Sequence, residues 1–304
     1  MEPIKSFKEL SARLTAVGRK RVALANAVDE HSLEAITMAI KAGFVEAYLV
    51  GSAEVIKQFD FLQTPDVAPY VHITDIADTL EATVEAVRKV KEGEADVLMK
   101  GLVNTDVLIR AILDKEKGLL PPGRVLSFTA SFQIPKYHKL LFFADPAVIP
   151  SPNVEQREAI IKYTIATARK FGVQQPKIAL VHATEKPSPK IQYMNDYLEI
   201  MERYRNGVFG DVIMDGPVDV FLALDKERGA IKKVPTPVLG DADIVIFPNF
   251  EAANAFYKAL ISFADAEMGG MLEGTSKPVV LTSRSEDIQS KFNSIALACI
   301  SANE

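Results

Sequence analysis

Short apolar runs that alternate with helical segments constrain the fold of this chain more than any other feature. Residues 21–25 and 47–51 have the composition of buried strands, and residues 33–40 between them place apolar side chains at helical spacing. The alternation continues, with further strands expected at residues 70–73, 95–99, 177–181, 212–214, 243–247 and 279–281. Strands joined by helices form largely parallel sheets with covered faces, so the sequence predicts an α/β protein with flanking helices.

One region departs from this alternation. Residues 125–130 and 140–145 resemble two paired strands with a polar connection between them, which predicts a mixed sheet. We place a boundary between two α/β lobes in this irregular region. The first predicted lobe comprises residues 1–134 and 282–304, and the second comprises residues 135–281.

Composition excludes several classes of protein. A net charge of −5 argues against a general nucleic-acid binder, and no apolar run approaches the roughly 20 residues that cross a bilayer. A single cysteine, Cys299, excludes an internal disulfide framework, and the four histidines show no metal-ligand spacing. The amino terminus lacks the apolar core of a signal peptide, so we expect a cytoplasmic protein without a metal site.

The turn after residues 279–281 carries the strongest functional signal. It holds Ser283, Arg284 and Asp287 and leads into a helix that starts near Ile288. Ligands of open α/β sheets bind at the carboxyl ends of strands, and helix amino termini favour anions. The planar guanidinium of Arg284 is shaped to bind phosphate, and Asp287 is a candidate base beside it. The turn is therefore a candidate anion site.

A structural interpretation competes with this one. Ser283 and Glu286 have the spacing of a helix capping box, and carboxylates such as Asp287 are common in the first turn of any helix. Local evidence alone favours capping. A cation at a helix start is mildly unfavourable, however, so the position of Arg284 favours a functional role.

A second candidate follows the strand at residues 95–99. Lys100 and Gly101 bring an ammonium group and backbone N–H groups to a strand end, and Asn104 follows closely. The segment matches neither a Walker loop nor G-x-G-x-x-G. Cys299 shares a helical face with Phe292 and is expected to be a core residue.

Several strings together resemble the phosphate acetyltransferase and butyryltransferase family, and its butyryl branch most closely. They are residues 95–103, Glu185-Lys186-x-x-Pro189-Lys190, Asp215-Gly216-Pro217, residues 240–244, residues 256–260 and Leu281-Thr282-Ser283-Arg284. These strings follow the order of the family, and the similarity runs from about residue 21 to residue 302.

The resemblance implies an isocitrate-dehydrogenase-like architecture, in which two lobes flank an active-site cleft, and commonly a homodimer or a higher homo-oligomer. It implies conversion of a short-chain acyl-CoA and phosphate to acyl phosphate and CoA. Coenzyme A and phosphate are then substrates, and no cofactor is needed. Ser283 and Arg284 match the Ser-Arg pair of the family. The family aspartate lies six residues beyond the arginine, whereas Asp287 lies three beyond Arg284.

A further departure concerns phosphate. The acetyl branch has an arginine five residues after the tyrosine of its Tyr-Lys string, and this place is Ser262 here. Lys258 is then a candidate to help hold phosphate. The candidate phosphate and CoA ligands are thus Lys100, Gly101, Asn104 and Lys258.

The leading hypothesis is direct attack within a ternary complex of enzyme, acyl donor and acceptor. A decarboxylating dehydrogenase on the same architecture is one rival, but it would need a carboxylate cluster for a divalent metal. A non-catalytic acyl-CoA-binding or regulatory protein is the other. The acyl chain length, the physiological direction and the identity of the base stay open.

Overall fold

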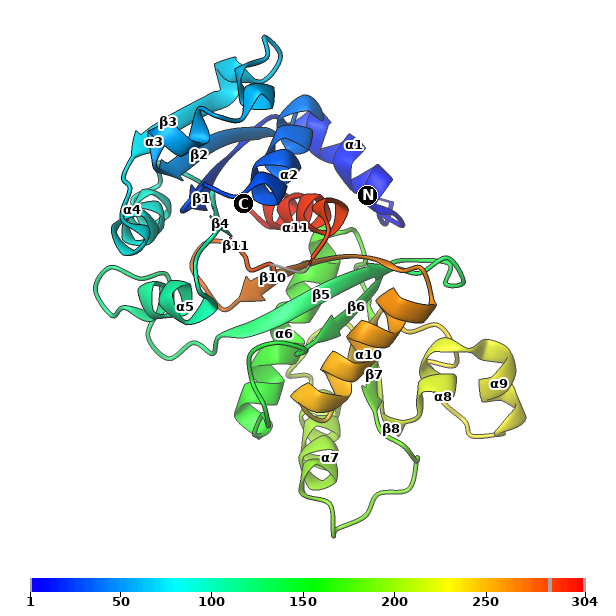
Figure 1. Cartoon of the computed structure of the whole chain (residues 1–304). Coiled ribbons are helices and arrows are strands. Elements are labelled where there is room, and N and C mark those ends of the chain that lie inside the picture. The colour runs from blue at the N-terminus through cyan, green and yellow to red at the C-terminus, as the bar shows by residue number, and fades with distance from the viewer. Residues whose placement is uncertain (1, 284–285, 303–304) are drawn as a thin grey trace. The chain divides into compact units, whose positions relative to one another are not determined.

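The computed structural model describes residues 2–283 and 286–302, which form two compact units (Figure 1). The terminal unit comprises residues 7–124 and 268–304, and the middle unit comprises residues 1–6 and 125–267. Both units combine strands and helices, so the predicted α/β class is confirmed.

The terminal unit contains a largely parallel sheet with the strand order β3-β2-β1-β4-β11-β10. Five of these strands run parallel, and β10 pairs antiparallel with β11. The strands are β1 (Lys20–Ala25), β2 (Val45–Gly51), β3 (Val71–Asp75), β4 (Val97–Lys100), β10 (Glu267–Glu273) and β11 (Val279–Val280). The expected strands at residues 21–25, 47–51, 70–73, 95–99 and 279–281 are therefore present.

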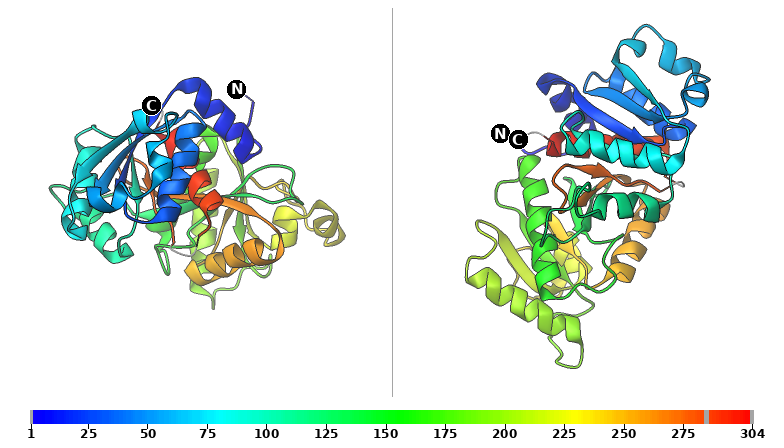
Figure 2. Two further views of the ribbon diagram at one scale, coloured as in Figure 1. Left: turned by 45° about the horizontal axis from the view of Figure 1, so that its top comes forward. Right: turned by 90° about the vertical axis from the view of Figure 1, so that its left-hand side faces the viewer.

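The helices of this unit cover its sheet on both faces. Right-handed crossovers place α2, which leads from β1 outward to β2, and α4, which leads from β3 back to β4, on opposite faces. Helix α11 lies beside α1 and α2, whereas α4 packs with α5 (Figure 2). The helices are α1 (Phe7–Val17), α2 (Glu30–Lys41), α3 (Ala53–Ile56), α4 (Thr79–Lys91), α5 (Thr105–Leu113) and α11 (Ile288–Ser301), with 3-10 turns at Asp60–Gln63 and Ala68–Tyr70.

The strand order reverses direction at β1. The chain moves outward from β1 through β2 to β3 and then returns to form β4 on the other side of β1. The connections that leave the carboxyl ends of β1 and β4 therefore diverge. Such a switch point leaves a crevice at the carboxyl edge of the sheet, which is where open α/β proteins bind ligands.

Strand β10 was not predicted, because Gly269 and Gly270 resemble the end of a helix. In the structure these glycines lie against α11. A Cβ atom on Gly269 would come within 2.8 Å of the backbone of Asn293, and the N–H of Gly270 donates to Oγ of Ser294 at 3.0 Å. The glycines thus let the helix approach the strand closely.

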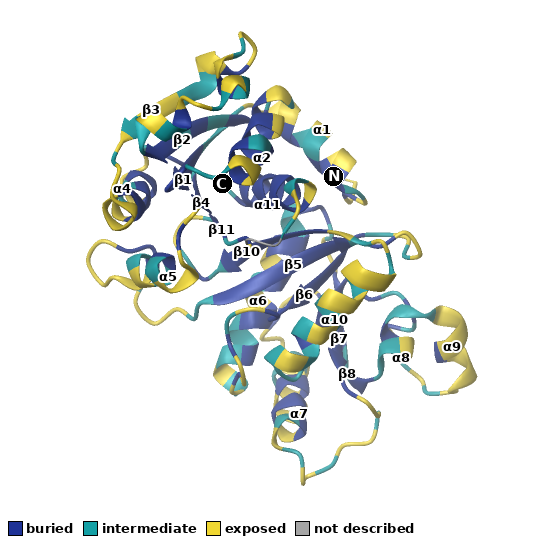
Figure 3. Cartoon of the chain, viewed as in Figure 1, coloured by how far each residue is buried: buried dark blue, intermediate teal, exposed yellow. Residues whose placement is uncertain are grey.

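Helix α11 is the central helix of the terminal unit. Every residue from Ser290 to Ser301 is buried (Figure 3), including Cys299. Lys291 is the one charged residue in the sequence of this helix. A buried ammonium group requires polar partners or an anion nearby, so Lys291 is an unusual feature of an otherwise apolar element.

The middle unit contains a sheet with the order β5-β6-β9-β7-β8. Strands β5 and β6 pair antiparallel, and β6, β9, β7 and β8 run parallel, which confirms the predicted mixed sheet. The strands are β5 (Ser127–Gln133), β6 (Leu141–Ala144), β7 (Lys177–Val181), β8 (Ile213–Val218) and β9 (Ile244–Ile246).

Two helices of the middle unit differ sharply in burial. Helix α6 begins with a reciprocal capping box between Asn153 and Gln156 and packs against the sheet. Helix α10 is strongly apolar in sequence, yet Ala253 is its single buried residue, and every residue of this helix is described (Figure 3). The helices are α6 (Val154–Lys170), α7 (Gln192–Arg205), α8 (Val220–Leu224), α9 (Lys226–Ile231) and α10 (Phe250–Phe263).

The boundaries of the two units differ from the predicted ones. The predicted divisions followed residues 134 and 281, whereas the chain divides after residues 6, 124 and 267. Strand β5 belongs with β6 because the two pair, and β10 and β11 belong to the terminal unit because β11 pairs with β4.

Candidate functional site

A pocket of about 270 Å³ lies at the switch point of the terminal unit. Residues 29–32 line it at the start of α2, residues 100–102 line it at the end of β4, and Lys291 lines it from α11. All three segments belong to one unit, and the pocket occupies the place where the topology predicts a ligand site. We call it the switch-point pocket.

Backbone contacts fix the floor of this pocket. The N–H of Gly101 donates to the carbonyl of Ala25 at 3.0 Å, and the N–H of Leu102 donates to the carbonyl of Asn26 at 3.0 Å. The side chain of Asn26 returns a hydrogen bond to the carbonyl of Leu102 at 2.6 Å. A Cβ atom on Gly101 would lie 2.5 Å from the carbonyl oxygen of Ala25, so glycine permits this close approach.

Two lysines supply the positive charge of the pocket. Lys100 is the last residue of β4 and is 4% exposed, and Lys291 of α11 is also 4% exposed. Both side chains line the pocket although they lie far apart in the sequence. Two ammonium groups that line one small pocket raise its positive potential, which favours an anion there.

Lys291 also organises the turn that follows β11. Its ammonium group donates to Oγ1 of Thr282 at 3.2 Å and to the carbonyl of Ser283 at 3.2 Å. Thr282 is buried and Ser283 is exposed. Lys291 therefore connects the predicted Ser283 segment to the switch-point pocket.

Glu286 closes the same turn. Its Oε1 atom accepts a hydrogen bond from the N–H of Ser283 at 2.8 Å. Burial raises the pKa of the Glu286 carboxyl above its ordinary value, and the hydrogen bond from Ser283 and the charges of Lys291 and Lys100 act in the opposite direction. This carboxyl group therefore shares its surroundings with both pocket lysines.

Asp287 has a different position from its neighbour. It is the N-cap of α11, and its Oδ1 atom accepts a hydrogen bond from the N–H of Ser290 at 2.6 Å. The expected capping box with Ser283 as the cap is thus wrong, because the helix begins four residues later. Arg284, the predicted phosphate ligand, lies outside the described residues.

The predicted ligands do not all come together. Lys100 and Gly101 line the switch-point pocket, whereas Asn104 is an exposed residue that precedes α5. Lys258 belongs to the middle unit, where it is exposed on α10 one helical turn before Ser262. This spacing places Lys258 and Ser262 on one face of the helix.

Sequence reasoning overlooked Lys291. A signal for Lys291 was present, because a lone charge in a 14-residue helix of apolar and small polar residues indicates a buried ammonium group. The spacing of Ser283 and Glu286 did indicate their contact, which is the reach-back bond of a capping box. Residue spacing does not reveal that Lys291 joins this turn to the pocket.

The charge of the pocket is mixed. Two ammonium groups line it together with the first turn of α2, where the helix dipole adds positive potential and the carboxylates of Asp29 and Glu30 oppose it. Among the described residues, no group of three or more His, Cys, Asp or Glu side chains is placed to hold a metal ion. No helix in this described part of the chain combines the length and apolarity needed to span a membrane.

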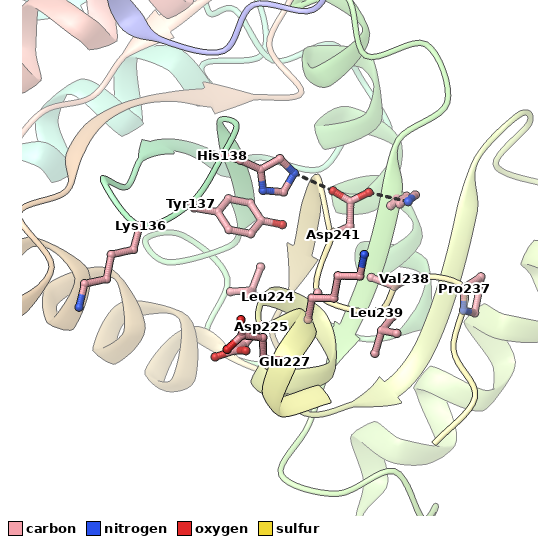
Figure 4. Close-up of a pocket in the computed structure, with 13 residues that line it drawn as sticks. Lys136, Tyr137, His138, Leu224, Asp225, Glu227, Pro237, Val238, Leu239 and Asp241 are labelled. Atoms are coloured by element: carbon pink, nitrogen blue, oxygen red, sulfur yellow. Dashed lines mark hydrogen bonds and ion pairs between the residues drawn. The ribbon is translucent and has the colours of Figure 1, made fainter. Parts of the chain in front are cut away.

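A second pocket, of about 670 Å³, lies in the middle unit at the amino ends of its parallel strands (Figure 4). Asp241 contacts His138 at 2.9 Å and Lys177 at 2.5 Å there. Burial alone would raise the pKa of Asp241, but hydrogen bonds from Lys177 and Lys139 outweigh it and hold this pKa well below its ordinary value. Open α/β proteins bind ligands at the carboxyl ends of their strands, and this pocket lies at the amino ends. We therefore regard this cluster as structural.

Cys299 is fully buried in α11. Burial raises the pKa of its thiol well above the ordinary value, so the reactive thiolate is disfavoured. The side chain behaves as a core residue, as predicted.

Comparisons with known proteins agree with the geometry. The chain matches the family model described as Phosphate acetyl/butaryl transferase over residues 71–299. It is 38% identical to the phosphate butyryltransferase of Clostridium beijerinckii over 298 residues, which cover 98% of either chain. It is 37% identical to the phosphate butyryltransferase of Clostridium acetobutylicum over 299 residues, which cover 98% of this chain and 99% of that relative. A solved branched-chain phosphotransacylase from Enterococcus faecalis V583 is similar with a TM-score of 0.83 and 28% identity, covering 94% of this chain and 99% of that one.

Proposed function

We propose, from the premise that the chain belongs to the phosphate acetyl/butyryl transferase family, that it transfers a short acyl group between CoA and phosphate. The substrates are a butyryl-CoA-like thioester and inorganic phosphate, and the products are acyl phosphate and free CoA. The full-length similarity to two phosphate butyryltransferases supports the butyryl-like substrate.

The observation that carries this proposal is the pair of buried lysines in the switch-point pocket. Phosphate carries one to two negative charges near neutral pH, and Lys100 and Lys291 offer two ammonium groups in one small pocket. A fixed pair of charges stabilises a phosphate group more effectively than water can, because the site does not reorganise during reaction.

The reaction requires few further protein groups. Holding phosphate and thioester together removes much of the entropic barrier, so direct attack needs no covalent enzyme intermediate. We assign Ser283 and Arg284 to the stabilisation of the developing oxyanion, as the family resemblance implies. Asn104 and Lys258 remain proposed contacts for phosphate or CoA, with Lys258 a candidate to help hold phosphate. The reaction is proposed to need neither a cofactor nor a metal.

The first prediction tests this activity directly. Purified protein with CoA thioesters of two to six acyl carbons and phosphate is expected to release CoA thiol and form acyl phosphate, with butyryl-CoA among the best substrates. Thiol release is followed with a disulfide reagent, and acyl phosphate is trapped as the hydroxamate. No acyl phosphate from any thioester would end the proposal. Loss of activity in EDTA with rescue by a divalent ion would end its metal-free part.

We also propose a homodimer that forms through α10. This helix exposes Phe263 at 88% and Ile261 at 40%, and exposed apolar surface of this kind marks interaction sites. Homo-oligomers are most often symmetric dimers, in which the same surface of each subunit forms the interface. An apolar helix face is well suited to such a contact.

Light scattering after gel filtration tests the dimer. The wild-type protein is expected at twice the mass of one chain, and Phe263→Glu is expected to shift it toward one chain mass. Val17→Glu is the control, because Val17 is exposed on α1 of the terminal unit. A wild-type monomer, or a Phe263→Glu protein that remains dimeric, would contradict the use of α10.

The proposed location is the cytoplasm. The chain contains a single cysteine, Cys299, and it is buried and free. A low cysteine content without disulfides is usual in reducing compartments. This location is supported by composition alone.

A further inference from the structure

Two neighbouring carboxylates follow Ser283, and the structure gives them different surroundings. Asp287 is exposed and caps α11, whereas Glu286 is partly buried and contacts the N–H of Ser283. The sequence offered Asp287 as the candidate base for the CoA thiol. Their contacts distinguish them.

Asp287 is fully explained by its structural contact. Its side chain satisfies the N–H of Ser290, one of the backbone donors that a helix start leaves without a partner. Its charge also complements the amino-terminal dipole of α11. Nothing in these contacts directs Asp287 toward the pocket lysines.

Glu286 is not the cap of α11, which is Asp287. One oxygen, Oε1, accepts from Ser283, and the described residues provide no hydrogen-bond donor for the other, Oε2. The charged groups that act on it come from three elements: Lys100 from β4, Lys291 from α11, and Asp287 from its own turn. Among the described residues, Oε2 is thus the oxygen left to accept a substrate proton, on the turn that Lys291 joins to the switch-point pocket.

We propose that Glu286, and not Asp287, exchanges the proton with the sulfur of CoA. This assignment rests on the proposed function and identifies its proton acceptor. It follows from the contact of Glu286 with the N–H of Ser283, the residue whose carbonyl also accepts from the pocket lysine Lys291.

The step balances as follows in the direction of CoA acylation. The thiol gives its proton to Oε2 of Glu286, and the sulfur electron pair forms a C–S bond with the acyl phosphate carbonyl carbon. The tetrahedral intermediate then collapses, the C–O bond to phosphate breaks, and phosphate leaves with that electron pair. Glu286 returns its proton to the departing phosphate, so the enzyme is unchanged.

The surroundings of Glu286 suit both directions of this reaction. Burial makes the carboxylate a better proton acceptor than an exposed one, which helps against a thiol of pKa about 8.5. The lysines nevertheless keep the ionised form accessible. In the reverse direction the protonated carboxyl can supply the proton that the departing thiolate needs.

Replacing Glu286 and replacing Asp287 are expected to affect the stability of the fold differently. A carboxyl whose pKa is raised by folding disfavours the folded state as the pH rises from its unfolded pKa through its folded pKa. Glu286→Gln removes that cost and is expected to leave the melting temperature at pH 7 unchanged or higher. Asp287→Ala removes a helix cap and is expected to lower it by about 2 °C.

The experiment compares Glu286→Gln with Asp287→Asn and Asp287→Ala in the acyl phosphate plus CoA assay. At pH 7, Glu286→Gln is expected to lower kcat by about 100-fold, the usual contribution of a positioned base. Asp287→Asn is expected to lose less than about fivefold, because asparagine caps a helix as well as aspartate does. The pair is matched, since each change replaces one carboxylate with its amide.

A pH profile separates a base from an orienting group. The deficit of Glu286→Gln is expected to shrink to about tenfold or less near pH 9.5, where the thiol ionises by itself. A near-normal Glu286→Gln rate at pH 7, or a deficit that does not change with pH, would overturn the assignment. A large, pH-dependent loss in Asp287→Asn would transfer the role to Asp287. An inactive wild-type protein would instead refute the proposed function, so the two failures are distinguishable.

Discussion

Replacing Lys100 with methionine is expected to lower kcat/KM for phosphate by about 1,000-fold, the upper end of the effect of one preorganised charge. The methionine side chain has a similar length but carries no charge. Lys100 is buried in the switch-point pocket, so no solvent cation can take its place. The loss is measured from initial rates of acyl phosphate formation at varied phosphate concentrations.

The matched control is Lys89→Met. Lys89 is also a largely buried lysine of the terminal unit, and it lies on α4. Its ammonium group pairs with Glu94 at 3.0 Å and does not line the pocket. This variant is expected to keep most of the activity. Equal rates for Lys100→Met and the wild type, with an intact circular dichroism spectrum, would show that the pocket does not bind phosphate.

Gly101→Ala is expected to reduce both stability and activity. The new Cβ atom would lie 2.5 Å from the carbonyl oxygen of Ala25 and 2.6 Å from that of Asn26, and both oxygens belong to the backbone. Neither can move without breaking the contacts that hold β1 and β4 in register. Overpacking of this kind costs about 3 kcal/mol, and the displaced backbone would carry Lys100 with it.

Gly93→Ala separates this clash from ordinary backbone strain. Gly93 has a φ of +79°, but no atom lies within 4 Å of the position where its Cβ would be. We expect a loss of about 1 kcal/mol from the left-handed conformation, with activity retained. Chemical denaturation measures the free energy of unfolding of both variants. A Gly101→Ala protein as stable and active as Gly93→Ala would contradict the close approach seen here.

Local periodicity was sufficient to predict most of the fold. Strands β1, β2 and β4 and helices α2 and α4 follow from alternating apolar runs, whereas the strand order, and with it the switch point, was not predicted. Strand β10 was missed because its glycines serve a long-range purpose, the close packing of α11. A local pattern does not record which helix will lie on a strand.

The site was less predictable than the fold. Lys100 and Gly101 were identified because they end a strand, and both line the switch-point pocket. Lys291 depends on contacts between elements that are far apart in the sequence. Spacing alone favoured Asp287, although the structure shows it to be the cap of α11.

The return of the last helix to the terminal unit has a consequence for synthesis of the protein. Lys100 emerges from the ribosome in the first half of the chain, but Lys291 is added almost at the end, after the whole middle unit. Domains generally fold as units during synthesis, so the middle unit can fold while the terminal unit still lacks α11 and β11. A nascent chain therefore has one wall of its anion pocket and cannot complete it before translation is nearly finished.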